Sequence, residues 1–238
     1  MTRSTAPRRI LIQLAHPLLE QSRLTRRLAD VARAIDGVTV NDLYEAYPTF
    51  DVDVRAEQAR LLAHDVIIFQ HPFFWYSVPA LLKQWQDLVL EHGWAYGAGG
   101  LALRRKLTFN VITTGGPAVA YQRGGYNLFT MRELLLPWEQ TAYLCGQRYL
   151  APFVIHGALR LTDEAVVVAR LDDYRRLLIA LRDHHLDVRL ARAAVNLADE
   201  LPTLVRPAGP GHAPDDEHDR ERDGDAHDGD VHDAPEAS

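Results

Sequence analysis

The chain has 238 residues, of which 47% are hydrophobic and 24% charged, and its formal net charge is −6 at pH 7. This composition is typical of an ordinary globular protein and excludes a fibrous, collagen-like or wholly disordered chain. The single cysteine, Cys145, excludes an intrachain disulfide, and polar residues and prolines interrupt the most apolar region, residues 66–82, so we expect no membrane span. A reducing cytoplasm is the expected location.

The first half of the chain alternates strand-like and helix-like segments. Residues 9–15 form a short apolar strand, and the apolar spacing that follows predicts a helix over residues 24–35, with Ser22 as its cap and Gly37 at its end. The pattern then predicts a second strand over residues 38–43, a short helix over 54–63 and a third strand, buried on both faces, over 65–70.

The second half continues the alternation. The pattern predicts a helix over residues 79–92, a glycine-rich loop over 93–100, a fourth strand over 107–113, a helix over 128–145 interrupted by Pro137, a fifth strand over 149–156, and a long final helix from residue 162. Five strands joined by crossover helices predict an α/β fold, a flavodoxin-like doubly wound parallel sheet in the order 2-1-3-4-5 with helices on both faces. Ligands bind such sheets at the carboxyl ends of the strands.

The end of the chain differs in composition from the rest. Residues 212–238 hold eleven acidic and two basic residues, so the remainder, with 21 acidic and 24 basic residues, has a net charge near +3. We predict one α/β domain over residues 1–200 and a disordered, acidic, histidine-rich tail over residues 201–238. The tail histidines lie among aspartates, and without fixed geometry a solvated acidic tail is favoured over a metal site, so no metal is predicted.

The loop after the first strand, residues 15–25, is suited to bind a phosphate. A helix begins there, and the N–H groups at its start are unpaired donors at the positive end of the helix dipole. Ser22 can add a hydroxyl while it caps the helix, because the two roles are compatible. His16 either donates to the phosphate or satisfies a local carbonyl.

The loops after the third and fourth strands are suited to hold a planar ring. Four consecutive aromatic residues follow the third strand, and either the core or a flat conjugated ligand would cover them: Phe73, Phe74, Trp75 and Tyr76. The fourth strand ends in a segment whose glycines admit a ligand close to the backbone and whose threonines can bond a heterocycle edge: Thr113, Thr114, Gly115 and Gly116. Together the three loops predict a flavin mononucleotide site.

These motifs resemble those of a known family. The segments that carry the likeness are Ala15-His16-Pro17 with Ser22, residues 70–79, His92-Gly93-Trp94-Ala95-Tyr96-Gly97, and residues 113–116. Over residues 9–185 the chain resembles the flavodoxin-like NAD(P)H:quinone oxidoreductases, and among them the ancillary proteins of the glutathione-regulated potassium-efflux system. The resemblance does not extend to the tail.

The resemblance implies a cofactor, an oligomeric state and a catalytic residue. The cofactor is FMN, or FAD, held by the residues His16, Ser22, Arg23, Leu24, Thr25, Phe73, Phe74, Trp75, Tyr76, Thr113, Thr114, Gly115 and Gly116. The protein would be a homodimer with active sites at the subunit interface. Tyr121 matches a tyrosine that assists hydride transfer, while the family's neighbouring histidine is absent and Tyr126 is the nearby aromatic residue.

The predicted function is two-electron, ping-pong hydride transfer from NADH or NADPH through the flavin to a quinone-type acceptor. One alternative is a flavin-binding regulatory subunit of a membrane potassium-efflux transporter, which would place the protein at the inner face of the cell membrane. Another is an azo-dye or flavin reductase, although the usual Gly-Ser-x-Arg start is absent. Glycine motifs for dinucleotides or nucleoside triphosphates, a hydrolase serine elbow and a concentrated basic stripe are also missing, so we expect neither those activities nor nucleic-acid binding.

Overall fold

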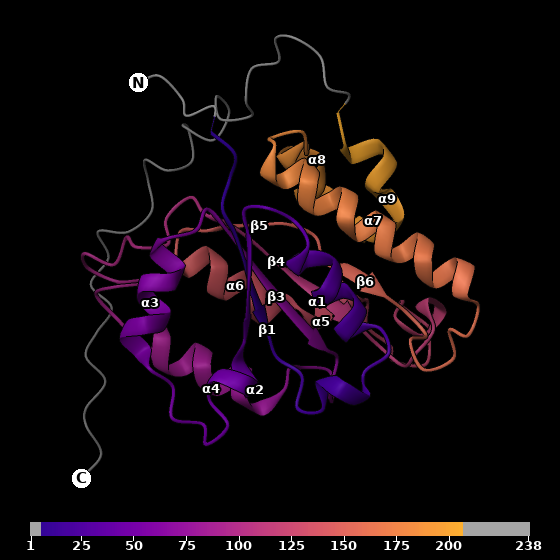
Figure 1. Cartoon of the computed structure of the whole chain (residues 1–238), viewed down its shortest axis with the longest axis horizontal. Coiled ribbons are helices and arrows are strands. Elements are labelled where there is room, and N and C mark those ends of the chain that lie inside the picture. Colours follow the sequence, from indigo (N-terminus) through magenta and orange to yellow (C-terminus); the bar gives the residue numbers. More distant parts are fainter. Residues whose placement is uncertain (1–5, 207–238) are drawn as a thin grey trace. The chain divides into compact units, whose positions relative to one another are not determined.

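A computed structural model describes residues 6–206, and its centre is one parallel sheet (Figure 1). The strands run in the order β2-β1-β3-β4-β5, with β6 also paired to β4. Their bounds are β1 Ile10–Leu14, β2 Val38–Asp42, β3 Val66–Pro72, β4 Leu107–Thr113, β5 Arg148–Tyr149 and β6 Phe153–Ile155. The predicted order of the sheet is confirmed, and every ladder is parallel.

Helices cover both faces of this sheet. Successive residues of a strand point to opposite faces, so Ile10 and Ile12 enter one apolar core and Leu11 enters the other. The first core is covered by α1 Thr25–Arg33, α7 Glu164–Arg182, α8 Val188–Ala193 and α9 Leu197–Leu204. The second is covered by α2 Leu43–Ala46, α3 Val54–Leu62, α4 Ala80–Val89, α5 Met131–Leu134 and α6 Leu136–Leu144 (Figure 1). Two short 3-10 helices, η1 Leu19–Gln21 and η2 Ala118–Ala120, lie in loops.

Two predicted elements are each divided in the structure. The predicted fifth strand is β5 and β6, because the chain leaves the ladder at Pro152, which has no N–H to donate, and the Ala151 N–H donates to the Ala191 carbonyl instead. The predicted helix over residues 128–145 is α5 and α6, which meet at Leu135, and Pro137 lies in the first turn of α6.

The chain beyond α7 forms helices that the sequence pattern did not separate. α7 begins after Asp163, whose carboxylate accepts from the Ala165 N–H, and α8 and α9 follow it. α9 crosses residue 200, the predicted end of the domain, and its Leu201 and Leu204 are buried in the core. The remainder of the predicted tail, from residue 207, lies outside the described residues, and its disorder stays a prediction.

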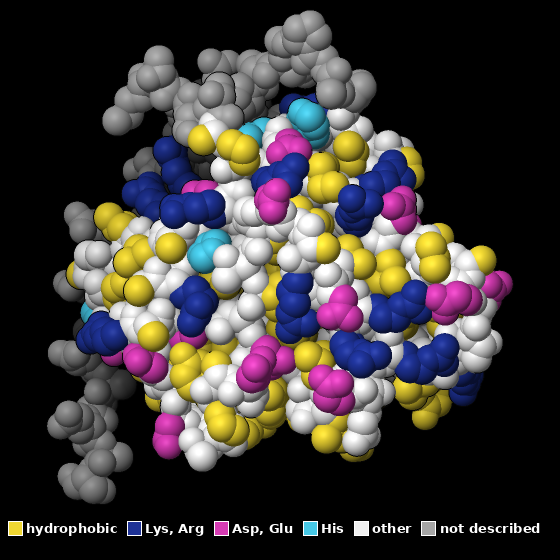
Figure 2. Space-filling model, in the orientation of Figure 1, with side chains coloured by type: hydrophobic (Ala, Val, Ile, Leu, Met, Phe, Trp, Pro, Cys, Tyr) yellow, Lys and Arg dark blue, Asp and Glu magenta, His cyan; other side chains and the backbone are white. Residues whose placement is uncertain are grey.

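Charges of both signs alternate on the face of the molecule that Figure 2 shows. Arg27 of α1 pairs with Glu164 of α7, and Arg170 of α7 pairs with Asp199 of α9. These pairs tie together the helices that cover the first core. In the part of the chain that the structure describes, no helix is long and apolar enough to cross a membrane.

Candidate active site

The first loop presents a neutral histidine beside the carboxyl end of β1. The Nδ1 atom of His16 accepts a hydrogen bond of 3.1 Å from the Leu18 N–H, so the proton of the neutral ring lies on Nε2. Partial burial lowers the pKa of His16, which favours this neutral form. The ring packs edge-on against Phe74, with 6.2 Å between ring centres. His16 is therefore set up to donate from Nε2.

The start of α1 offers further donors. The Ser22 hydroxyl accepts from the Thr25 N–H at 3.2 Å, as a helix cap does. Within residues 6–206, the N–H groups of Arg23 and Leu24 have no hydrogen-bond partner. The side chain of Leu24 is buried and that of Arg23 is exposed, so Leu24 can contribute only its backbone to a ligand. These free N–H groups at a helix start suit an anion.

Thr25 connects the first loop to the third. Its hydroxyl lies 3.1 Å from the Thr113 hydroxyl, and both side chains are buried. Gln70 donates to the Thr25 carbonyl at 3.0 Å, and Tyr174 donates to Gln70 at 2.9 Å. The ends of β1, β3 and β4 are thus joined by side chains beneath the candidate site.

The second loop is a strained turn that presents aromatic rings. Trp75 and Tyr76 have φ values of 51° and 60°, and the Ser77 N–H donates to the Phe74 carbonyl at 2.9 Å, as in a type I′ turn. Residues other than glycine take this left-handed conformation at a cost of roughly 1–2 kcal/mol each. The side chain of Trp75 is nevertheless 93% exposed. Strain combined with an exposed aromatic ring is typical of a ligand site.

The four aromatic residues of the second loop differ in exposure: one packs against the core and three face outward. Phe73 packs against the second core and contacts Tyr121 and Tyr76 with ring-centre distances of 6.1 and 6.4 Å. Tyr76 donates from its hydroxyl to Asn127 at 3.3 Å. Phe73 is therefore half-buried, while Phe74, Trp75 and Tyr76 remain exposed.

The third loop brings a tyrosine onto the glycines. The Thr114 N–H donates to the Ile155 carbonyl at 3.1 Å, which fixes the loop to the end of β6. The hydroxyls of Thr114 and Tyr121 are hydrogen-bonded to each other. A side chain on Gly116 would lie 3.0 Å from the Tyr121 ring, so glycine at this position lets Tyr121 pack against the backbone.

An open pocket of about 590 Å³ lies between the second and third loops. It is lined by Phe73, Trp75, Tyr76, Thr114, Gly115, Gly116, Pro117, Val119, Ala120, Tyr121, Tyr126 and Asn127. Its volume is in the range of small-molecule sites, and its apolar and aromatic walls suit a flat ring. The other predicted residues do not line it: His16, Ser22–Thr25, Phe74 and Thr113. Among them, His16 packs against Phe74, and the hydroxyls of Thr25 and Thr113 are hydrogen-bonded.

Five residues that line the pocket were not predicted as site residues: Pro117, immediately before η2, and the four residues Val119, Ala120, Tyr126 and Asn127. These four come from η2 and the loop after it, whose sequence has no strand or helix periodicity that would place it. His156 was missed as well, and its ring centre lies 5.3 Å from that of Tyr121. His156 and Tyr121 are 35 positions apart in the sequence, so no local pattern indicates their contact. They meet because β6, which precedes His156, pairs with β4.

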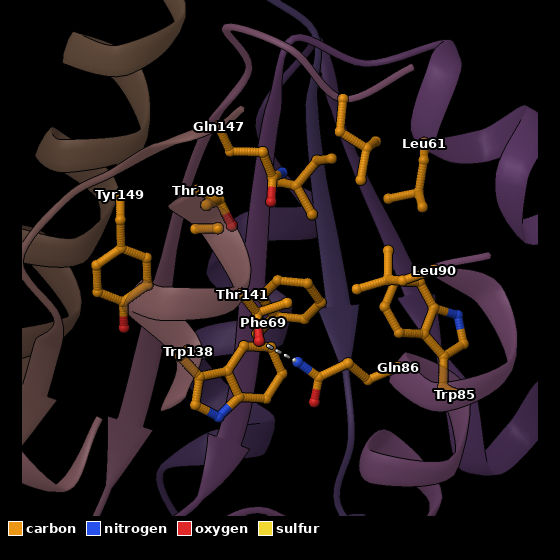
Figure 3. A pocket seen from close by; sticks show the side chains of 13 residues that line it. Leu61, Phe69, Trp85, Gln86, Leu90, Thr108, Trp138, Thr141, Gln147 and Tyr149 are labelled. Carbon is orange, nitrogen blue, oxygen red and sulfur yellow. Dashed lines mark hydrogen bonds between the residues drawn. The ribbon is translucent and has the colours of Figure 1, made fainter. Parts of the chain in front are cut away.

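A second cavity lies inside the molecule, among the residues that join β3 and β4 to α4 and α6 (Figure 3). Its volume is about 10 Å³, room for about one water molecule. Gln86 donates to Thr141 across it at 3.3 Å. It is too small for a planar cofactor, so the open pocket is the candidate site.

Comparison with known proteins agrees with this architecture. A profile of the flavodoxin-like fold family matches residues 8–178. The glutathione-regulated potassium-efflux system ancillary protein KefF of Klebsiella aerogenes is 42% identical over 176 residues, which is 74% of this chain and 98% of that protein. The uncharacterized NAD(P)H oxidoreductase YdeQ of Bacillus subtilis is 43% identical over 156 residues, 66% of this chain and 79% of that protein.

Solved structures are similar over the same region. General stress protein 14 of Treponema denticola, solved in complex with FMN, is 37% identical with a TM-score of 0.66, covering 74% of this chain and 98% of that one. An NADPH-quinone reductase from P. pentosaceus is 34% identical with a TM-score of 0.62, covering 75% and 98%. The family profile ends within α7, so α8 and α9 lie beyond it.

Proposed function

The chain belongs to the flavodoxin-like fold family, and on that premise we propose that it binds FMN in the open pocket and reduces a quinone-type acceptor with electrons from NADH or NADPH. The observation that carries the proposal is the strained turn at Trp75 and Tyr76, which faces the third-loop glycines across the pocket. Relatives named NAD(P)H oxidoreductase and NADPH-quinone reductase support the activity, and the relative solved with FMN supports the cofactor.

The residues present fit the parts of FMN. The phosphate would be held by His16 Nε2–H, the Ser22 hydroxyl, and the N–H groups of Arg23, Leu24 and Thr25 as the Ser22 bond rearranges. The aromatic turn, Phe73 to Tyr76, would cover one side of the ring, and Thr113 to Gly116 would meet its polar edge. FAD carries the same ring and phosphate, so extraction of the bound cofactor separates the two.

Bound flavin would supply the redox chemistry, a two-electron, ping-pong hydride transfer between NAD(P)H and the acceptor. The protein supplies binding, orientation and electrostatics. Tyr121, whose hydroxyl is held by Thr114, would orient the acceptor by a hydrogen bond to its oxygen. The backbone dipoles of Thr114 to Gly116 would stabilise negative charge at the ring edge.

Fluorescence titration of the cofactor-free protein with FMN tests the site. We expect His16→Ala and Trp75→Ala each to raise the FMN dissociation constant about tenfold, a loss of about 1.4 kcal/mol each. Arg33→Ala, on the surface of α1, is the matched control and should leave the constant unchanged. Equal affinity in all four proteins would contradict the assignment of the site.

We also propose a homodimer that covers the rim of the pocket. Large apolar side chains are exposed there, with Val119, Tyr126, Leu128 and Phe129 between 52% and 90% exposed. Val119 and Tyr126 line the pocket and Leu128 and Phe129 follow in the same loop, and exposed apolar side chains gathered in this way are typical of an interface. Sedimentation should show a dimer, and Leu128→Asp should give a monomer with weaker FMN binding; a wild-type monomer with full affinity would contradict the proposal.

The second candidate function is regulation of a potassium-efflux transporter. The relatives named ancillary proteins of such a system, 42% to 45% identical, favour it. The protein would then work in the cytoplasm at the inner face of the membrane. Variants that abolish turnover yet still activate the transporter would support regulation as the function, and variants that lose both together would support reductase chemistry.

A further inference from the structure

His156 lies against Tyr121, a residue that lines the pocket, and none of the motifs in the sequence includes it. Its ring is tilted by 42° to the Tyr121 ring, with 5.3 Å between centres. The backbone on both sides of His156 is fixed, because the Thr114 N–H donates to the Ile155 carbonyl and the Gly157 N–H donates to the Gly116 carbonyl at 2.9 Å. The ring therefore has a defined position behind Tyr121.

One nitrogen of the His156 ring makes no hydrogen bond to the described residues. Within the described chain, its Nδ1 atom is buried and has no hydrogen-bond partner. A buried polar atom without a partner is uncommon and calls for an explanation. A histidine that places such an atom beside the ring of Tyr121 indicates a role beyond filling space.

Four neighbouring residues contact Tyr121. Its hydroxyl bonds to the Thr114 hydroxyl, its ring packs on Gly116, and His156 lies against the ring. Phe73 contacts the same ring at 6.1 Å. Movement of the histidine would therefore move the phenol that lines the pocket.

The C-terminal helices hold β6, the strand that ends immediately before His156. The Asn196 side chain accepts from the Val154 N–H at 2.9 Å and donates to the Val154 carbonyl at 3.2 Å, as a neighbouring strand would. The Leu197 N–H donates to the Pro152 carbonyl at 2.9 Å. Residues 196 and 197 lie beyond the part of the chain that the family profile matches.

We propose that His156 is a positioning residue for Tyr121, and that the segment around Asn196, at the start of α9, fixes it there by bonding to β6. The neutral His156 ring fixes where the Tyr121 hydroxyl meets the acceptor, and protonation of His156 shifts Tyr121. This inference deepens the proposed function and rests on it for the identity of the acceptor.

Charged groups on the neighbouring elements bear on the protonation of His156. Burial lowers the pKa of His156, Asp199 of α9 raises it, Arg170 of α7 lowers it, and the Gly116 carbonyl raises it. Asp199 and Arg170 pair with each other at 2.9 Å, so their effects largely offset. Burial dominates, and His156 is neutral at pH 7 and becomes protonated only in acid.

The test follows Tyr121 directly in cofactor-free protein. The chain is labelled with 3-fluorotyrosine, the Tyr121 fluorine resonance is assigned with Tyr121→Phe, and its shift is recorded from pH 7.5 down to pH 5 (about the range in which a histidine titrates). The variants are His156→Phe, which keeps a ring, His156→Gln, which keeps polarity without charge, and the control His185→Phe, outside the pocket. Steady-state KM and kcat for menadione, and the FMN dissociation constant, are measured on the loaded proteins.

We expect the Tyr121 resonance to titrate in the wild type and in His185→Phe and to be flat in both His156 variants. We expect KM for menadione to rise about three- to tenfold in His156→Phe, with kcat and FMN affinity within about twofold. A Tyr121 titration that survives in both His156 variants overturns the proposal, as does an unchanged KM. The fluorine titration needs no turnover. It therefore tests the effect of His156 on Tyr121 even if the protein proves not to be a quinone reductase.

Discussion

Individual residues at this site combine local strain with exposure. Trp75 and Tyr76 take left-handed backbone conformations that their side chains disfavour, although the surrounding turn buries little of Trp75. A turn that folds at this cost without gaining packing is best explained by what it binds. Stability and ligand affinity should therefore change in opposite directions when the strain is removed.

Trp75→Gly removes that strain. Glycine adopts positive φ freely, so we expect the free energy of unfolding to rise by about 1 kcal/mol, seen as a higher midpoint in urea. FMN affinity should fall at least as far as in Trp75→Ala. Val168→Gly, at an exposed position beyond the first turn of α7, is the control and should destabilise the protein instead. A lower midpoint for Trp75→Gly would contradict the argument from strain.

His71 makes stability depend on pH. It is fully buried, its Nε2 accepts from Asn110 Nδ2 at 3.1 Å, and its Nδ1–H donates to the Pro72 carbonyl at 3.0 Å. Burial lowers the pKa of His71 to about 4, so the neutral form stabilises the fold above pH 6.5 and this contribution is lost as pH falls from 6.5 through 4.

Protonation of His71 should lower the free energy of unfolding by about 3 kcal/mol at most. Urea unfolding of the wild type between pH 7 and pH 4 measures it, with His71→Gln as the comparison. The variant should be less stable at pH 7 and should lose less stability over this pH range. Parallel pH profiles for the two proteins would show that His71 is not the cause.

At the scale of elements, one buried carboxylate joins helices to β1 and β2 near the carboxyl ends of these two strands. Glu57 of α3 is fully buried and accepts from five side chains: Gln13, Asn41, Tyr47, Arg60 and Trp85. These donors come from β1, β2, α3, α4 and the loop after α2. An ionised acceptor surrounded by donors is satisfied, and replacing it with an amide leaves donors facing each other.

Glu57→Gln should therefore destabilise the protein by about 2–4 kcal/mol. Glu45→Gln, an exposed change on α2, should stay within about 0.5 kcal/mol of the wild type. Both values come from denaturant unfolding at pH 7. A Glu57→Gln variant as stable as the control would mean that the carboxylate contributes no net stability.

Elements with strong periodicity could be predicted from the sequence, and those with mixed signals could not. β1 to β4, α1, α3 and α4 have clear apolar patterns with caps or prolines at their ends, and the structure places them within a few residues of the predicted bounds. The sequence predicts an interruption of the helix over residues 128–145 at Pro137, whereas Pro152 divides an apolar run that reads as one strand. α8 and α9 were missed because Asp187 and Asn196 start new helices inside what reads as one long helical segment.

At the scale of the whole molecule, the C-terminal helices belong to the core although they lie beyond the family profile. Val188, Ala191, Leu197, Leu201 and Leu204 are all buried on the α7 face of the sheet. Burial of each large apolar side chain stabilises the fold by about 1.5–3 kcal/mol, and this contribution is lost when the side chain is removed. The boundary between essential and dispensable chain should therefore lie after α9.

Two truncations locate this boundary. A chain that stops after Arg206 should keep the melting temperature and FMN affinity of the full protein, because the acidic segment it lacks has few apolar residues. A chain that stops after His185 loses α8 and α9 and should fail to unfold cooperatively in calorimetry. If the shorter chain melts like the full one, the helices do not support the fold.

The site could be predicted from the sequence only in part. The rule that ligands bind at the carboxyl ends of strands brings together the three loops, and the structure joins them through Thr25, Thr113 and Gln70. The lining from Val119 to Asn127, and His156 beside Tyr121, depend on how irregular loops fold and on which strand pairs with β4. Neither leaves a periodic signal in the chain.

The central claim is that the protein carries electrons through bound flavin, and an anaerobic visible spectrum tests it most directly. The protein is saturated with FMN, desalted, treated with NADPH and then with menadione. We expect flavin to remain bound, its absorbance to bleach with NADPH and to recover with menadione. Flavin that is lost on desalting, or that never bleaches with NADPH or NADH, would contradict the oxidoreductase account.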